Sequence, residues 1–269
     1  MVYGIAKMLN FAHGDVIMVG GYISFCMTMY MGMNGWLALL IAVAVCTLLG
    51  ILIERLAYRP LRGTGSLAVL ITAIGVSYFL QNAALLIWGA NPRVFTSLFK
   101  GMETKHFANG QLTVTPESLF TIVACIIIMI ALTLFVNKTK AGKAMRAVSY
   151  DMGAASLMGV NVNKTIATTF VIGSILAAAG GVLYATAYPQ IDPTMGYIPG
   201  LKAFVAAVLG GIGSIPGAML GGVILGVAET MTKAYISSQY ADAISYCILI
   251  VILLVKPTGL LGSKKVVKV

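Results

Sequence analysis

The chain has 269 residues, of which 59% are hydrophobic and only 10% are charged. Soluble domains carry about 25% charged residues, so the composition excludes a water-soluble fold and indicates an integral membrane protein. The formal net charge of +10 does not indicate a nucleic-acid partner, because most basic residues fall in three short segments, residues 55–62, 138–164 and 256–268. That grouping follows the positive-inside rule of membrane proteins.

Long charge-free runs predict the transmembrane helices, because a spanning helix needs about 20 mostly apolar residues. The runs are continuous, whereas the strands of a membrane β-barrel alternate apolar and polar residues. We therefore expect an all-α integral membrane protein, a polytopic helical bundle that forms one transmembrane domain over residues 1–269. In chain order, the simple helices are expected at residues 16–32, 36–57, 67–88, 119–136, 166–187 and 243–255.

A polar motif, Asn-Phe-Ala-His-Gly-Asp at residues 10–15, directly precedes the first apolar run. One interpretation is a helix break in which Asp15 caps the next helix, since Asp is favoured at helix N-termini. The other interpretation places the polar side chains of Asn10, His13 and Asp15 on a substrate path. The two interpretations are compatible, and both stay open here.

Residues 201–228 form an apolar segment that is too long for one helix and too short for two full spans. Its centre, residues 210–217, is rich in glycine and contains a proline, a combination that breaks helices. A single crossing would also place the basic tail on the opposite side from the other basic segments. We expect a re-entrant hairpin of two short helices, with the irregular backbone of Gly210, Gly211 and Gly213 beside a transport path.

Small residues recur at a spacing of four, which lets helix backbones approach closely. Packing within the chain is favoured over a subunit interface as the reason for this pattern. The positions are Gly173, Ala177 and Gly181, then Gly213, Gly217 and Gly221, and finally Gly222 and Gly226.

No catalytic motif is present. The chain has no P-loop, no His-Glu-x-x-His and no Cys-x-x-Cys, so we expect no enzyme activity, no metal and no cofactor bound by the chain itself. The acidic residues Asp15, Asp192, Glu229 and Asp242 fall near the ends of the expected segments. Self-powered carriers usually place ionisable groups inside the membrane, so this distribution favours a channel or a pore that a partner drives.

A polar island at residues 137–164 separates two apolar runs, and we expect it on the cytoplasmic side because it is basic. It contains Gly-Ala-Ala-Ser-Leu-Met-Gly at residues 153–159, which resembles the EAA loop that seats in a groove on the ATPase of ABC importers. The resemblance implies an ATPase-coupling loop formed by Asp151, Gly153, Ala154, Ala155 and Gly159. Gly153 stands where the motif usually has an acid, and Asp151 lies two residues earlier.

Further motifs follow in a fixed order. After the motif at residues 10–15 come Gly-Lys-Ala-Met-Arg-Ala, Leu-Ala-Ala-Ala-Gly-Gly-Val-Leu-Tyr-Ala, Leu-Gly-Gly-Ile-Gly-Ser-Ile-Pro-Gly-Ala and Lys-Pro-Thr-Gly-Leu-Leu-Gly. In the residues of these motifs and in their order, the chain resembles the LivH-type permease of branched-chain amino acid ABC importers over nearly its whole length.

The resemblance implies a translocation path for leucine, isoleucine and valine across the bacterial inner membrane, with a cytoplasmic C-terminus. The implied partners are a second, LivM-like permease, two ATPase subunits that hydrolyse ATP, and a periplasmic binding protein that meets the outer loops at residues 89–118, 188–200 and 229–242.

The chain departs from the family pattern at its start, where Met-Val-Tyr-Gly begins at the point at which a further N-terminal helix usually ends. We therefore expect that helix to be missing here. Urea or amide permeases of the same family share the layout, so this substrate class stays open, although Phe11 favours amino acids. A self-sufficient carrier or channel and a non-transporting membrane scaffold also stay open.

Overall fold

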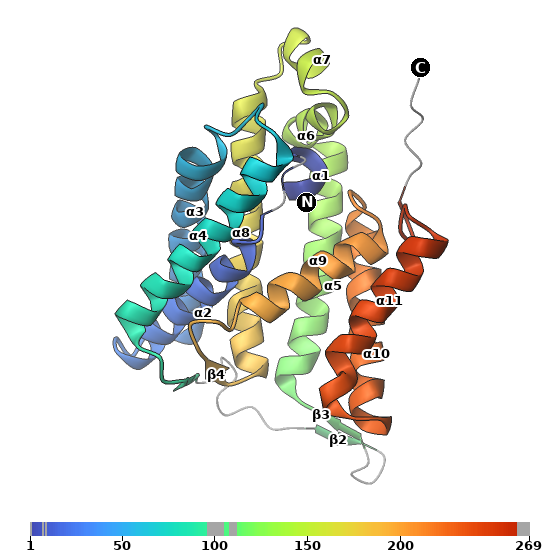
Figure 1. Cartoon of the computed structure of the whole chain (residues 1–269). Helices are drawn as coiled ribbons and strands as arrows, with labels where there is room; N and C mark the ends of the chain where they lie inside the picture. Colours follow the sequence, from blue (N-terminus) through green and yellow to red (C-terminus); the bar gives the residue numbers. More distant parts are fainter. Residues whose placement is uncertain (1, 7, 9, 96–104, 108–111, 263–269) are drawn as a thin grey trace.

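The computed structural model describes residues 2–6, 8, 10–95, 105–107 and 112–262. It is a bundle of long helices with short strands at one end (Figure 1). Within the described part of the chain, six helices are long and apolar enough to cross a membrane, which confirms the polytopic all-α class. We call the end that carries α6 (Lys140–Tyr150) and α7 (Met152–Leu157) the α7 end, and the end that carries β4 (Gln190–Ile191) the β4 end.

The first part of the chain follows the expected segments closely. A break separates a short first helix from the second, as the motif at residues 10–15 predicts, and the third helix continues directly into a π-helical turn. The elements are α1 (Val2–Ala6), α2 (His13–Met29), α3 (Gly35–Ile53), the π-helix η1 (Glu54–Tyr58) and α4 (Ser66–Trp88). Asn34 caps α3 by accepting a hydrogen bond from the Trp36 amide, which explains why the helix begins there.

Short strands at the β4 end were not predicted. β1 (Arg93–Val94) pairs antiparallel with β4, with Arg93 opposite Ile191, and β2 (Lys105–Phe107) pairs antiparallel with β3 (Leu112–Val114). Much of the expected outer loop at residues 89–118 lies outside the described residues.

The middle of the chain supplies the polar island and two spans. α5 (Pro116–Lys138) runs to the α7 end, α6 and α7 form the island there, and α8 (Val162–Ala187) returns to the β4 end (Figure 1). Oxygen-bearing side chains cap the starts of these helices: Thr115 for α5, Thr139 for α6, Asp151 for α7 and Asn161 for α8. Such caps satisfy amide groups that have no partner inside the helix.

The glycine-rich run breaks the next segment, as expected. α9 (Tyr197–Gly210) and α10 (Ile215–Tyr235) meet at the break, and the 3-10 turn η2 (Ser238–Tyr240) leads to α11 (Ala241–Val255). The expectation of two short helices was wrong for the second helix, α10. Fourteen residues give α9 a length of about 21 Å, too short for a core of about 30 Å, whereas the 21 residues of α10 reach about 31 Å.

The segment after α11 closes the free end of α9. The amides of Leu260 and Leu261 donate to the carbonyls of Leu209 and Gly210, each over 2.9 Å. Gly211 has a φ of +106° and would carry a Cβ into the backbone of Gly262, so this turn requires glycine. The motif at residues 256–262 thus supplies hydrogen-bond donors to the tip of the α9–α10 hairpin.

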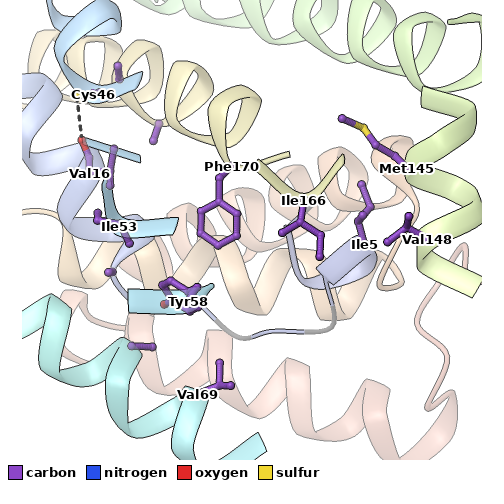
Figure 2. Packing of buried hydrophobic residues seen from close by; sticks show 14 of the residues in the cluster. Ile5, Val16, Cys46, Ile53, Tyr58, Val69, Met145, Val148, Ile166 and Phe170 are labelled. Atoms are coloured by element: carbon purple, nitrogen blue, oxygen red, sulfur yellow. Dashed lines mark hydrogen bonds between the residues drawn. The ribbon is translucent and has the colours of Figure 1, made fainter. Parts of the chain in front are cut away.

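A core cluster joins the island to the membrane helices (Figure 2). Phe170 of α8 contacts the Tyr58 ring at a centroid distance of 5.2 Å. Met145 and Val148 of α6 are fully buried and lie beside Ile5 of α1 (Figure 2). α6 is therefore fixed by its packing against the core cluster and is not a free loop.

Two of the small-residue patterns act within the chain, as expected. A Cβ on Gly181 would meet the carbonyl of Ile17 on α2, and a Cβ on Gly221 would meet the carbonyl of Ala206 on α9. In the third pattern, a Cβ on Gly222 would lie 4.0 Å from Ala206 Cβ, whereas a Cβ on Gly226 would have no atom within 4 Å, so only Gly226 points away from the described chain.

Candidate functional site

A cavity of about 510 Å³ lies between α4, α9 and the residues around the start of α2. Its volume falls within the range of small-molecule sites, about 300–1,000 Å³. Most of the wall is apolar, and the ring centroids of Phe11 and Phe204 lie 6.3 Å apart, with the ring planes tilted by 51°. The lining residues are Asn10, Phe11, Asp15, Ile74, Ser77, Tyr78, Gln81, Thr194, Tyr197, Ile198, Gly200, Leu201 and Phe204.

Polar groups from α2 and α4 converge on one part of this wall. Gln81 Nε2 donates to Asp15 Oδ1 over 2.9 Å and to the Ser77 hydroxyl over 3.2 Å. Asp15 is only 2% exposed. A buried carboxylate that is held by an amide, itself bonded to a hydroxyl group, within an apolar wall is suited to recognise a polar or cationic part of a small ligand.

Asp15 lies deep within the bundle, although it is close to the start of its apolar run in the sequence. α2 begins about half-way along α8 (Figure 1), and His13 Cε1 lies 3.8 Å from the position of a Cβ on Gly173, near the middle of α8. Asp15 does lie in the first turn of its helix, as expected, but that helix end lies inside the bundle, so the expectation of an interior without ionisable groups was wrong for Asp15. The short α1 and the break after it place the start of α2 inside the bundle.

The break motif has more than one structural role. Asn10 and Asp15 line the cavity, and Asn10 Oδ1 accepts a hydrogen bond of 2.8 Å from the Tyr58 hydroxyl. His13 is not among the lining residues and faces α8 instead. The expected cap by Asp15 is not formed, because the N-cap position of α2 is Ala12 and no side chain bonds there.

The glycines of the second break lie away from the cavity. Gly210 packs against Gly217, Gly211 packs against Gly262, and Gly213 lies beside Gly4. None of Gly210, Gly211 and Gly213 is among the residues that line the cavity. That these glycines line a translocation path stays a prediction. In the structure they allow neighbouring backbone segments to pack closely.

Sequence reasoning missed the contribution of α4. Ser77, Tyr78 and Gln81 line the cavity, yet the helix was expected only as a spanning segment. Ser77 and Gln81 are four residues apart and therefore share one helix face, and polar side chains inside a membrane helix usually face protein or a polar path. The four-residue spacing of Ser77 and Gln81 is therefore the sequence pattern that could have predicted a polar face on α4.

A second cavity, of about 390 Å³, lies beside a cluster of ion pairs that joins α9, α10 and α11. Lys202 of α9 contacts Glu229 and Asp242, each over 2.8 Å, and Lys233 contacts Glu229 over 2.6 Å. These pairs tie α9 to the two helices that follow it.

The island ends in a short helix at the far end of the bundle (Figure 1). Asp151 Oδ1 caps α7 by accepting from the amides of Gly153 and Ala154 over 2.7 and 3.0 Å. Ala155 is buried against the core, and Gly159 has a φ of +80° where the chain turns after the helix. Asp151 thus acts as the N-cap of α7, and Gly159 supplies the left-handed turn that ends the helix.

Two apolar side chains on the island were missed from the sequence. Leu157 is 90% exposed and Met158 is 85% exposed, at the tip that projects furthest from the bundle (Figure 1). Exposed apolar side chains on a projecting tip are typical of an interaction site. They lie between Ala155 and Gly159, inside the segment expected to couple.

A buried ion pair links the start of α8 to the π-helix η1. The Arg62 guanidinium donates to Glu54 Oε1 and to Asn163 Oδ1. Burial lowers the pKa of Arg62 from its ordinary value, while the neighbouring Glu54 acts against that shift. Glu54 opens the π-helix that ends at Tyr58, whose hydroxyl bonds Asn10. The π-helix therefore joins two sets of polar contacts, one with Asn163 at the start of α8 and one with Asn10 on the cavity wall.

Removing one partner of this pair is expected to be costly. In Arg62→Ala the Glu54 side chain, 5% exposed, would remain buried without its cation, at a cost of about 3–5 kcal/mol. The double variant Glu54→Leu, Arg62→Leu is expected to lie closer to the wild type, because it removes both charges. Thermal unfolding of the detergent-purified protein measures both. Equal midpoints for Arg62→Ala and the wild type would contradict the prediction.

The chain matches known proteins over its full length. A family model described as "Branched-chain amino acid transport system / permease component" matches residues 1–253. The high-affinity branched-chain amino acid transport system permease protein LivH of Escherichia coli (strain K12) is 46% identical over 278 residues, covering 100% of this chain and 90% of the relative.

Two further relatives extend the comparison. The permease protein BraD of Pseudomonas aeruginosa is 44% identical, covering 100% of this chain and 91% of the relative. A probable branched-chain amino acid transport permease protein LivH of Methanocaldococcus jannaschii is 29% identical, covering 97% and 85%. No solved structure matches. The chain, a multi-pass helical membrane protein, therefore belongs to the family of permease components of branched-chain amino acid transport systems.

Proposed function

We propose that the chain is the membrane-spanning subunit of an ATP-driven importer, and that leucine, isoleucine and valine cross the inner membrane beside its cavity. The cavity is the observation that supports this proposal, because it lies in a chain that belongs to this permease family. A mostly apolar wall suits a branched aliphatic side chain, and the buried polar group around Asp15 suits the charged end of an amino acid.

The energy is proposed to come from partner subunits. The complex would contain two ATPase subunits. One of them would dock on α7, in contact with Leu157 and Met158, and Asp151, Gly153, Ala154, Ala155 and Gly159 would shape that tip. The motion would pass through α6 and α8, which pack into the core. A second, LivM-like permease would complete the path, and a periplasmic binding protein would deliver substrate at the β4 end.

The basic segments support this orientation. Residues 55–62 and the island lie at the α7 end, and α11 runs back toward it (Figure 1). From the positive-inside rule we infer that this end is cytoplasmic and propose that the C-terminus is on the same side. Lys264, Lys265 and Lys268 of the tail lie outside the described residues.

Uptake by the reconstituted complex tests the substrate. Proteoliposomes that contain the chain with its partner subunits and enclosed ATP are expected to take up labelled leucine when binding protein is added outside. Excess isoleucine or valine should suppress this uptake, and excess urea should not. Suppression by urea alone would assign the chain to an amide permease, and uptake without ATP would indicate a self-sufficient carrier.

A further inference from the structure

Asp15 is a buried carboxylate without a cationic partner among the described residues. Oδ1 accepts a hydrogen bond from Gln81, whereas Oδ2 has no hydrogen-bond partner in the described part of the chain. The ion pairs found there involve Glu54, Glu229 and Asp242 instead. Burying an ionised carboxylate costs several kcal/mol unless a charge or hydrogen bonds compensate it.

This carboxylate is also in the right place to meet a ligand. Asp15 lines the cavity together with Ser77 and Gln81. The close backbone contact of Gly14 with Gly196 and Gly200 fixes the first turn of α2 against α9, so the carboxylate is held by a rigid support. Preorganised groups of this kind bind a ligand with little further ordering.

We propose that Asp15 binds the α-ammonium group of the amino acid in transit, with Gln81 and Ser77 orienting the carboxylate. The inference rests on the proposed function and adds the substrate group that the chain itself recognises. An ammonium group carries three hydrogen-bond donors and a positive charge, which matches the unpaired acceptor Oδ2 of Asp15. The branched side chain would lie against Phe11, Leu201 and Phe204.

An organic cation fits this site better than a metal ion. Within the described residues, no group of three or more His, Cys, Asp or Glu side chains could hold a metal. A single carboxylate flanked by an amide and a hydroxyl group is too small a ligand set for a hard cation such as Ca²⁺, which takes 6–8 oxygen ligands. The apolar remainder of the wall has no role in binding a bare ion.

The first experiment measures leucine uptake and ATP hydrolysis together in proteoliposomes with saturating binding protein. Asp15→Asn keeps the shape of the side chain and removes its charge. Uptake is expected to fall about tenfold or more, the factor given by loss of a hydrogen bond to a charged group, while ATP hydrolysis stays within about twofold of wild type. Asp15→Glu should recover part of the uptake because it restores the carboxylate.

A matched control lies on the same helix. Ser24 is fully buried, and its hydroxyl has no partner among the described residues, but it does not line the cavity. Ser24→Ala is expected to transport like the wild type. Equal uptake by Asp15→Asn and wild type, or equal losses in Asp15→Asn and Asp15→Glu, would overturn the proposal.

A second measurement uses only the wild-type complex and therefore does not depend on how a variant folds. Labelled leucine is bound to the purified, nucleotide-free complex without binding protein, and analogues compete for the site. Leucinamide, which keeps the ammonium group, should compete, and 4-methylpentanoate, which lacks it, should not. Competition by 4-methylpentanoate alone, or no saturable leucine binding, would overturn the assignment of Asp15. If the wild type fails to take up leucine at all, the proposed function itself fails.

Discussion

Replacement of Leu157 and Met158 together by aspartate is expected to abolish ATP-driven amino acid uptake and to prevent the ATPase subunits from co-purifying. The two side chains are 90% and 85% exposed at the tip of the island, so aspartate there does not disturb the core of the chain. Apolar residues that anchor an interface typically cost about 2 kcal/mol or more each when removed, which is about thirtyfold in affinity.

The measurement is the amount of ATPase retained when the permease is purified through a tag, together with leucine uptake in cells. Tyr235→Asp serves as the control. Tyr235 is 83% exposed, but it ends α10 at the β4 end (Figure 1), away from the island. Its variant should retain the ATPase subunits. If the double variant also retains them, α7 is not the docking element.

Introduction of valine at Gly14 is expected to have the second large effect. A Cβ on Gly14 would meet the carbonyl of Gly196 and lie 3.3 Å from the Cα of Gly200, both in the backbone at the start of α9. Backbone cannot move aside as a flexible side chain can, so α2 and α9 must separate. Overpacking of this kind typically costs about 1–3 kcal/mol, and sometimes more.

The measurement is the fraction of protein that stays monodisperse in detergent on warming, followed by leucine uptake. Gly180→Val is the matched control, because a Cβ on this α8 glycine would have no atom within 4 Å. Gly14→Val should fall well below Gly180→Val in both measurements. Similar behaviour of the two variants would mean that the α2–α9 contact does not hold the cavity wall together.

The sequence predicted the spanning helices well because hydrophobicity and caps are local properties. The charge-free runs at residues 67–88 and 119–136 became α4 and α5, and the glycine-rich run broke its helix where expected. Helix breaks depend on the residues at the break itself, so they can be found without knowledge of the tertiary structure.

The rest depends on contacts between distant parts of the chain. The depth of Asp15 follows from the packing of α2 against α8 and α9, and its hydrogen bond comes from Gln81, far along the sequence. The exposure of Leu157 is set by which face of the island packs on the core. The pairing of Arg93 with Ile191 depends on two loops that meet only after the bundle has formed.

The closure of α9 by the segment after α11 bears on how the chain matures. A ribosome adds residues in order, so the carbonyls of Leu209 and Gly210 enter the membrane long before the amides of Leu260 and Leu261 exist. Until then the tip of the hairpin must rely on water or on other proteins for its hydrogen bonds, because unsatisfied backbone groups are costly in lipid. The α9–α10 hairpin can therefore reach its final form only after the segment that follows the last helix has been translated.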